Sequence, residues 1–102
     1  MPHEKSLFVK LLGNSPYIRV LDFLLTYRGF DFSKKEIGKN ANVSYNTLNS
    51  FWCEMISNGI IIKTGRKDGQ DVFRLNKENN FVKNLITLFD SITIESIASY
   101  LS

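Results

Sequence analysis

The spacing of apolar residues limits what this chain can fold into more than any other feature, because its period changes near residue 59. From residue 15 to 58, apolar side chains recur every three or four residues, as on one face of a helix. Between Ile60 and Leu75 the pattern is that of two short strands around a polar segment, and after residue 79 the helical period returns. This order predicts a mostly helical α+β fold, with helices packed on a small antiparallel hairpin.

The length of 102 residues and the hydrophobic fraction of 43% indicate a single folded domain. We expect three parts within it. These are an arm or short helix over 1–14, a unit of helices and a hairpin over 15–76, and a C-terminal helix over 77–102.

Serines mark the expected helix starts. Ser15 can cap a helix whose first position suits Pro16, and Ser33 with Glu36 has the capping-box pattern. Ser44 precedes the next apolar repeat in the same way. We therefore expect helices over about 15–28, 33–40 and 44–58, a very short strand at 30–32, strands at 60–64 and 71–75 with a loop at 65–70, and a last helix from residue 79 or 80.

Helix 44–58 separates clearly into two faces. At 100° per residue, one third of its circumference is apolar and is expected in the core. This core set comprises Tyr45, Leu48, Phe51, Trp52 and Met55. The outward face near its N-terminus carries Asn46, Thr47, Asn49 and Ser50, with Tyr45 at the edge.

Two helices joined by a tight turn and followed by a hairpin form a winged helix-turn-helix. The second helix of such a unit enters the major groove of duplex DNA, and the hairpin lies along the backbone or in the minor groove. Asparagine amides can pair with adenine, and hydroxyls can bond base edges or phosphates. Asn46 and Asn49 therefore suggest a site that contains A·T pairs.

The positive charge is concentrated in residues 33–67, where six basic and two acidic residues leave +4, against −1 for the rest and +3 for the whole chain. Helix 44–58 itself has no Lys or Arg, so attraction to phosphates has to come from its neighbours. The residues expected to contact the DNA backbone lie on the preceding helix and on the hairpin, which is the wing of this fold. They are Ser33, Lys34, Lys35, Lys39, Lys63, Arg66 and Lys67.

Several stretches occur together in a fairly specific order. They are Gly13–Pro16 with Arg19–Leu24, Phe32–Lys34 with Glu36–Ile37, Asn42–Ser44 with Thr47–Leu48 and Trp52, Asn58–Ile60, and Arg74–Asn76 with Asn79–Asn80. Over residues 13–85 the chain thereby resembles small archaeal winged-helix transcriptional regulators of the MarR/ArsR-like superfamily.

This resemblance implies sequence-specific binding to double-stranded DNA, usually as a dimer, with helix 44–58 reading bases and the wing at 65–70 touching the backbone. The residues that take the reading role by this likeness are Ser44, Tyr45, Asn46, Thr47, Asn49 and Ser50.

The last helix has a broader apolar sector than one packing surface needs, which predicts a homodimer contact through Leu85, Leu88, Phe89 and Ile92. A symmetric dimer would set two reading helices about 34 Å apart, which is one turn of DNA. The alternative is a monomer whose last helix only covers the core. The β-branched run 92–94 is weak helix material and predicts a break or kink near 91–93.

Other classes of function find little support in the sequence. The single cysteine, Cys53, and the single histidine, His3, provide neither a metal site nor a nucleophile with its base, so no enzyme and no cofactor are expected. Apolar runs are too short for a membrane span, and no secretion signal is evident, so a cytoplasmic, nucleoid-associated protein is expected. An effector ligand is left open.

The main alternative is a winged helix that binds another protein and not DNA. Exposure of Phe51 or Tyr45 would favour that alternative. A continuous positive surface from Lys34 to Lys67 would favour DNA.

Overall fold

The computed structural model describes residues 6–101, with side chains described through residue 94. The elements follow the order α1 (Leu7–Leu12), α2 (Pro16–Thr26), β1 (Phe32–Ser33), α3 (Lys34–Ala41), α4 (Tyr45–Ser57), β2 (Ile61–Lys67), β3 (Gln70–Leu75) and α5 (Asn80–Leu101). The three strands form one antiparallel sheet in the order β1-β3-β2. The expected α+β, mostly helical class is confirmed.

Serine caps begin the helices as the sequence predicts. The Ser15 hydroxyl accepts a hydrogen bond from the backbone N–H of Ile18, and that of Ser44 accepts one from Thr47. Ser33 and Glu36 form a complete capping box, with distances of 3.1 and 2.9 Å. A cap of this kind stabilises a helix by about 1 kcal/mol, so local sequence alone sets these boundaries.

The core lies where α2, α3 and α4 pack on one face of the sheet. Val20, Ile37 and Met55 are completely buried there. Trp52 packs edge-on against Phe73 of β3, with ring centroids 5.0 Å apart, which confirms its predicted core position.

The hairpin is tighter than the predicted loop at 65–70. Strand β2 continues to Lys67 and β3 begins at Gln70, so only Asp68 and Gly69 form the turn. Their φ angles of 53° and 79° are those of a type I′ turn, and an Asp-Gly pair adopts these angles more readily than most pairs. A bulge between Lys63 and Gly65 interrupts the ladder. The predicted short strand at 30–32 is also shifted, because β1 pairs with β3 through Phe32 and Ser33.

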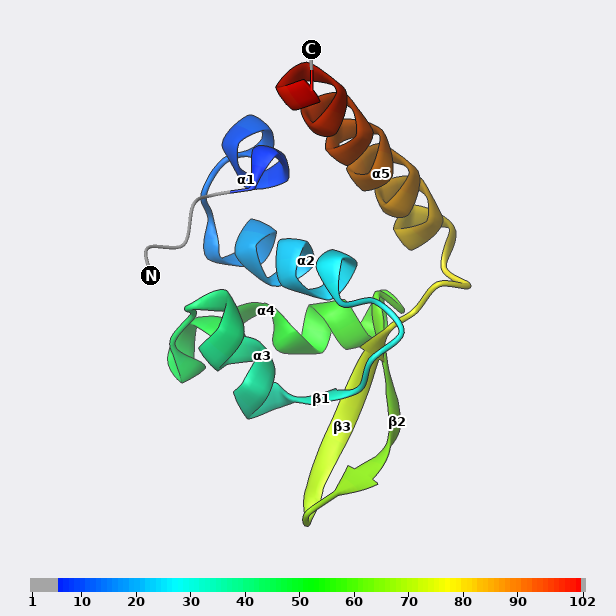
Figure 1. Ribbon diagram of the computed structural model, residues 1–102. Helices are drawn as coiled ribbons and strands as arrows, with labels where there is room; N and C mark the ends of the chain where they lie inside the picture. The colour runs from blue at the N-terminus through cyan, green and yellow to red at the C-terminus, as the bar shows by residue number, and fades with distance from the viewer. Residues whose placement is uncertain (1–5, 102) are drawn as a thin grey trace.

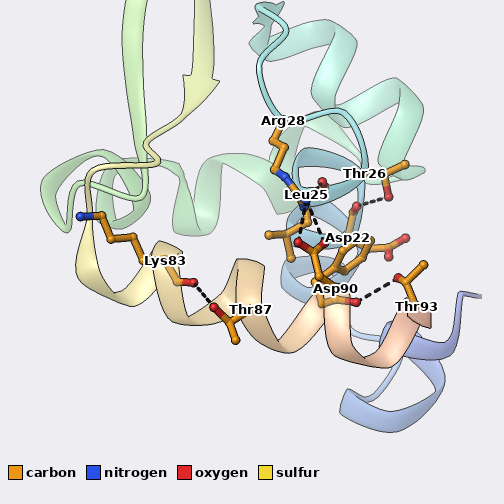
Figure 2. A network of polar contacts seen from close by, with 9 residues as sticks. Asp22, Leu25, Thr26, Arg28, Lys83, Thr87, Asp90 and Thr93 are labelled. Atoms are coloured by element: carbon orange, nitrogen blue, oxygen red, sulfur yellow. Dashed lines mark hydrogen bonds and ion pairs between the residues drawn. The ribbon is translucent and has the colours of Figure 1, made fainter. Parts of the chain in front are cut away.

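Helix α5 runs without a break from Asn80 to Leu101, so the predicted break near 91–93 is wrong. The Thr93 hydroxyl donates to the Phe89 carbonyl at 2.9 Å, inside the helix (Figure 2). Ile92 is buried in the core cluster. β-branched residues lower helix stability by only a few tenths of a kcal/mol each, and burial of one side chain offsets that cost.

An ion pair and an aromatic contact help to join α5 to the rest of the molecule, in addition to its buried Val82 and Ile92. Figure 2 shows Arg28, just beyond the end of α2, reaching Asp90 in the middle of α5, with Nη2 2.8 and 2.9 Å from the two carboxylate oxygens. Phe89 meets Phe8 of α1 edge-on at 5.5 Å. The predicted arm over 1–14 thus contains a short helix that packs on α5, while residues 1–5 lie outside the described part.

The two ends of the molecule carry different elements. Helices α1 and α5 lie at one end, and the β2–β3 hairpin projects from the other (Figure 1). Among the described residues, no helix has the length and apolar content needed to cross a membrane.

Candidate nucleic-acid interface

The N-terminal half of α4 presents a polar surface to solvent. Asn46, Asn49 and Ser50 are exposed, and Thr47 is half-buried. The Ser44 hydroxyl donates to the Thr47 hydroxyl at 2.9 Å, and the Ser50 hydroxyl donates to the Thr47 carbonyl at 2.5 Å. Because these hydroxyls already have partners within the helix, the two asparagine amides are the groups most available to a ligand.

Tyr45 departs from the prediction that it belongs to the core, since 62% of it is exposed. Tyr45 is the first residue of α4, at the end of the helix that is not covered by the rest of the domain. Leu48, one turn further along α4, is buried. Phe51 is half-buried and packs on Tyr17 of α2 at 5.0 Å. Helical angle alone cannot distinguish a residue at the end of a helix from one in its middle.

Lys34 supplies the positive charge that α4 lacks. Its side chain starts on α3, and its ammonium donates a hydrogen bond to Oδ1 of Asn49. The same ammonium lies 4.9 Å from the ring centroid of Tyr45 and 5.2 Å from that of Trp52, within the range of cation–π attraction. The prediction placed Lys34 among the phosphate contacts, whereas the structure brings it onto the predicted base-reading face.

A shallow depression of about 170 Å³ lies between α3 and the start of α4. Its lining residues are Lys34, Lys35, Gly38, Lys39, Val43, Tyr45 and Leu48. Three lysines therefore surround a largely apolar floor at the turn between the two helices.

Gly38 allows α3 to approach this turn closely. A Cβ atom at this position would lie 3.1 Å from the Val43 carbonyl oxygen and 3.4 Å from a Leu48 methyl carbon. A glycine inside a helix lowers helix stability by about 1 kcal/mol relative to alanine. A glycine within a predicted helix therefore indicates a position where another segment packs closely.

Arg19 of α2 holds the same turn in position, which sequence reasoning missed. Its Nε donates to the Ala41 carbonyl and its Nη2 to the Asn42 carbonyl, each at 3.1 Å, while Nη1 reaches the Asn14 carbonyl at 3.1 Å. Asn42 ends α3 with a φ of 57°, in the left-handed region that asparagine tolerates. Because α4 starts three residues later, these bonds help to set its direction.

The cations of the hairpin are partly neutralised by one carboxylate. Asp71 lies 3.2 Å from the Lys63 ammonium and 3.7 Å from Nε of Arg66. Nη2 of Arg66 also donates to the Gly69 carbonyl at 2.5 Å, across the turn. Lys67 has no ion pair among the described residues, and it is exposed like Lys35 and Lys39.

Ser33 is buried, unlike the exposed lysines, so the prediction that it contacts the DNA backbone is wrong. Only 3% of the residue is exposed, and its hydroxyl and backbone N–H are both engaged with Glu36. A capping side chain buried in this way holds α3 but cannot reach a phosphate.

The base of the hairpin is tied to the loop before β1 by Asp31. Its carboxylate accepts hydrogen bonds from the Thr64 hydroxyl at 2.8 Å and from Arg74 at 2.9 and 3.1 Å. The hydrogen bond from Thr64, and then that from Arg74, lower the pKa of Asp31 below its ordinary value. Asp31 therefore links the loop before β1 to both strands of the hairpin.

The predicted dimer residues have unequal access to a partner. Leu88 is 42% exposed, whereas Leu85 and Phe89 are half-buried and Ile92 is only 8% exposed. Ile92 therefore packs inside its own chain and leaves the predicted interface. Other exposed apolar side chains on α1 and α5 are Leu11, Leu12, Phe81 and Ile94.

Within the described residues no group of three His, Cys, Asp or Glu side chains could hold a metal ion, and Cys53 is an exposed free thiol. Comparison of the chain with protein-family models, curated proteins and solved structures gives no significant match. The function proposed below therefore rests on the fold and the geometry of α3, α4 and the hairpin.

Proposed function

We propose that this chain is a winged helix-turn-helix transcriptional regulator that binds a specific sequence in double-stranded DNA. Helix α4 enters the major groove, and the β2–β3 hairpin contacts the backbone or the minor groove. The observation that carries the proposal is the exposed polar face of α4, which carries the amides of Asn46 and Asn49 and the Lys34 ammonium bonded to Asn49. Amide and ammonium groups are those that bond base edges in the major groove.

The surrounding charges support contact with a polyanion. Lys35 and Lys39 are exposed beside α4, and Lys63, Arg66 and Lys67 lie on the hairpin. Because Lys34 lies on the reading face, five cations are left for phosphates, and together they would give a slope of log affinity against log salt of about −4.5 per monomer. Asp71 cancels part of the hairpin charge, so a slope nearer to about −4 is expected.

The proposal includes a homodimer formed through α5 and α1, at the end of the molecule opposite to the hairpin. Exposed Leu88, Phe81 and Ile94 lie on α5, and Leu11 lies on α1. From Asn84 to Ile94 the only charged residue is Asp90, which is paired with Arg28. An uncharged helix surface with exposed apolar side chains favours a protein contact over solvent. Cytoplasmic, nucleoid-associated location follows from this role.

The proposal is tested by selection from random duplex DNA at about 150 mM salt, followed by sequencing of the bound fraction. An enriched inverted repeat is expected, with half-sites about one helical turn apart. A single enriched half-site would retain the DNA role and remove the dimer. No enrichment, together with no retained DNA at low salt, would overturn the proposal.

A winged helix that binds protein and not DNA is the second candidate, and the exposure of Tyr45 favours it. Phe51 does not, since it is half-buried against Tyr17. The Lys34 ammonium over the Tyr45 ring adds positive charge at the same place, which favours an anionic partner. The DNA selection separates the two candidates, because only the first predicts an enriched sequence.

A further inference from the structure

Lys34 is fixed to one stripe of α4. Its ammonium contacts Tyr45, Asn49 and Trp52, which follow one another at intervals of four and three residues and so share one side of the helix. A lysine on an open surface samples many rotamers, whereas three simultaneous contacts hold this one. The ammonium is therefore pre-organised on the base-reading face.

The position of Lys34 is not explained by the stability of its own helix. It is the first residue of α3, where the positive end of the helix dipole disfavours a cation. Among the described residues, no carboxylate lies within 4.0 Å of its ammonium. Its contacts are with the side chains of α4, so its charge acts at that surface.

The contact with Lys34 determines which way the Asn49 amide faces. An ammonium has three donors and no acceptor, so Asn49 must present Oδ1 to it. The NH2 group of Asn49 is then left to face a ligand, beside the remaining N–H groups of Lys34. The groups that this pair turns toward a ligand are therefore mainly hydrogen-bond donors, because Oδ1 already accepts from the ammonium.

Donors alone match guanine better than adenine. In the major groove guanine presents two acceptors, N7 and O6, whereas adenine presents one acceptor and the N6 amino donor. An asparagine that reads adenine needs its own oxygen for that amino group. Oδ1 of Asn49 keeps a second lone pair. An adenine amino group bound there would lie beside the Lys34 ammonium, and the positive hydrogens of these two donors would repel one another.

We infer that Lys34 and Asn49 act together as a guanine-reading pair within the proposed DNA complex. This inference rests on the proposed function and replaces the A·T expectation at the position that Asn49 meets. Asn46 has no such neighbour among the described contacts, so its amide retains both donor and acceptor. The predicted half-site thus contains one guanine whose recognition depends on a residue outside the reading helix.

The experiment compares the sequences selected from random duplex DNA by wild type, Lys34→Met and Lys35→Met, each at a salt concentration that gives equal retention. Methionine keeps the length and apolar stem of lysine and removes the charge. Lys35→Met is the matched control, because Lys35 is the exposed neighbour on the same helix and does not contact Asn49. Circular dichroism confirms that all three proteins are folded.

The wild type is expected to prefer guanine over adenine at one position by about 5- to 140-fold, the range for a good bidentate contact. Lys34→Met should lose that preference or change it to adenine, while the other positions are unchanged. Lys35→Met should bind all sequences more weakly with the same base preferences.

Two results would overturn the inference and leave the proposed function intact. One is an enriched site in which Lys34→Met keeps every base preference of the wild type, and the other is equal behaviour of the two lysine variants. Absence of any enriched sequence with the wild type would instead refute the proposed function, and the inference with it.

Discussion

Replacement of Arg19 by methionine tests whether the turn between α3 and α4 is held by α2. Methionine retains the apolar stem of the side chain and removes the guanidinium. The carbonyl groups of Asn14, Ala41 and Asn42 then lose their donor. The variant should be less stable than the wild type, and α4 should be less firmly oriented.

The expected loss follows from the environment of each bond. The bond to Ala41 is partly buried and involves a charged donor, so it contributes about 1.5 kcal/mol. The bonds to Asn14 and Asn42 are exposed and contribute about 0.5 kcal/mol each. The total is about 2.5 kcal/mol, which lowers the melting temperature of a domain this size by about 10 °C or more.

Thermal and urea unfolding, followed by circular dichroism, measure this loss. Arg19→Lys should recover only part of it, because an ammonium cannot span three carbonyls as a planar guanidinium does. Arg66→Met is the control, since Arg66 is exposed on the hairpin and its loss should change stability by less than about 0.5 kcal/mol. A loss below about 0.5 kcal/mol for Arg19→Met, or full recovery by lysine, would refute the reasoning.

Three further predictions concern the hairpin and α5. The lowered pKa of Asp31 means that its ion pair stabilises the fold above about pH 4 and that this contribution is lost as the pH falls through the lower folded-state pKa. The stability difference between wild type and Asp31→Asn, measured by urea unfolding, should therefore shrink below about pH 4, and a constant difference down to pH 2 contradicts this assignment. Asp71→Asn should free Lys63 and Arg66, raise DNA affinity at low salt and steepen the salt slope by about 1, whereas an unchanged slope means that these cations do not meet phosphates. Leu88→Asp should shift the chain to monomers in sedimentation while its circular dichroism remains that of a folded protein, and an unchanged mass would exclude this surface as the dimer contact.

Local sequence determines most of the boundaries in this fold. Ser15, Ser33 and Ser44 cap the helices as predicted, because a hydroxyl bonds a backbone N–H only three residues away. The tight turn at Asp68 and Gly69 is equally local. The Asp-Gly pair itself predicts this turn, and the predicted loop at 65–70 did not make use of it. That α5 continues through residues 91–93 could not be predicted from local sequence, because the burial of Ile92 depends on elements distant in sequence.

The order of helices and strands, the apolar side of α4 and the polar character of its exposed side could be predicted from sequence, since each depends on spacing along one segment. The positions of Lys34 on α4, of Arg19 at the turn and of the buried Ser33 could not, and they are seen only in the folded chain. These features join residues of different elements, and their separation in space depends on how the elements pack. The chemistry that the α4 surface offers to a ligand is therefore set by packing as much as by the residues of α4.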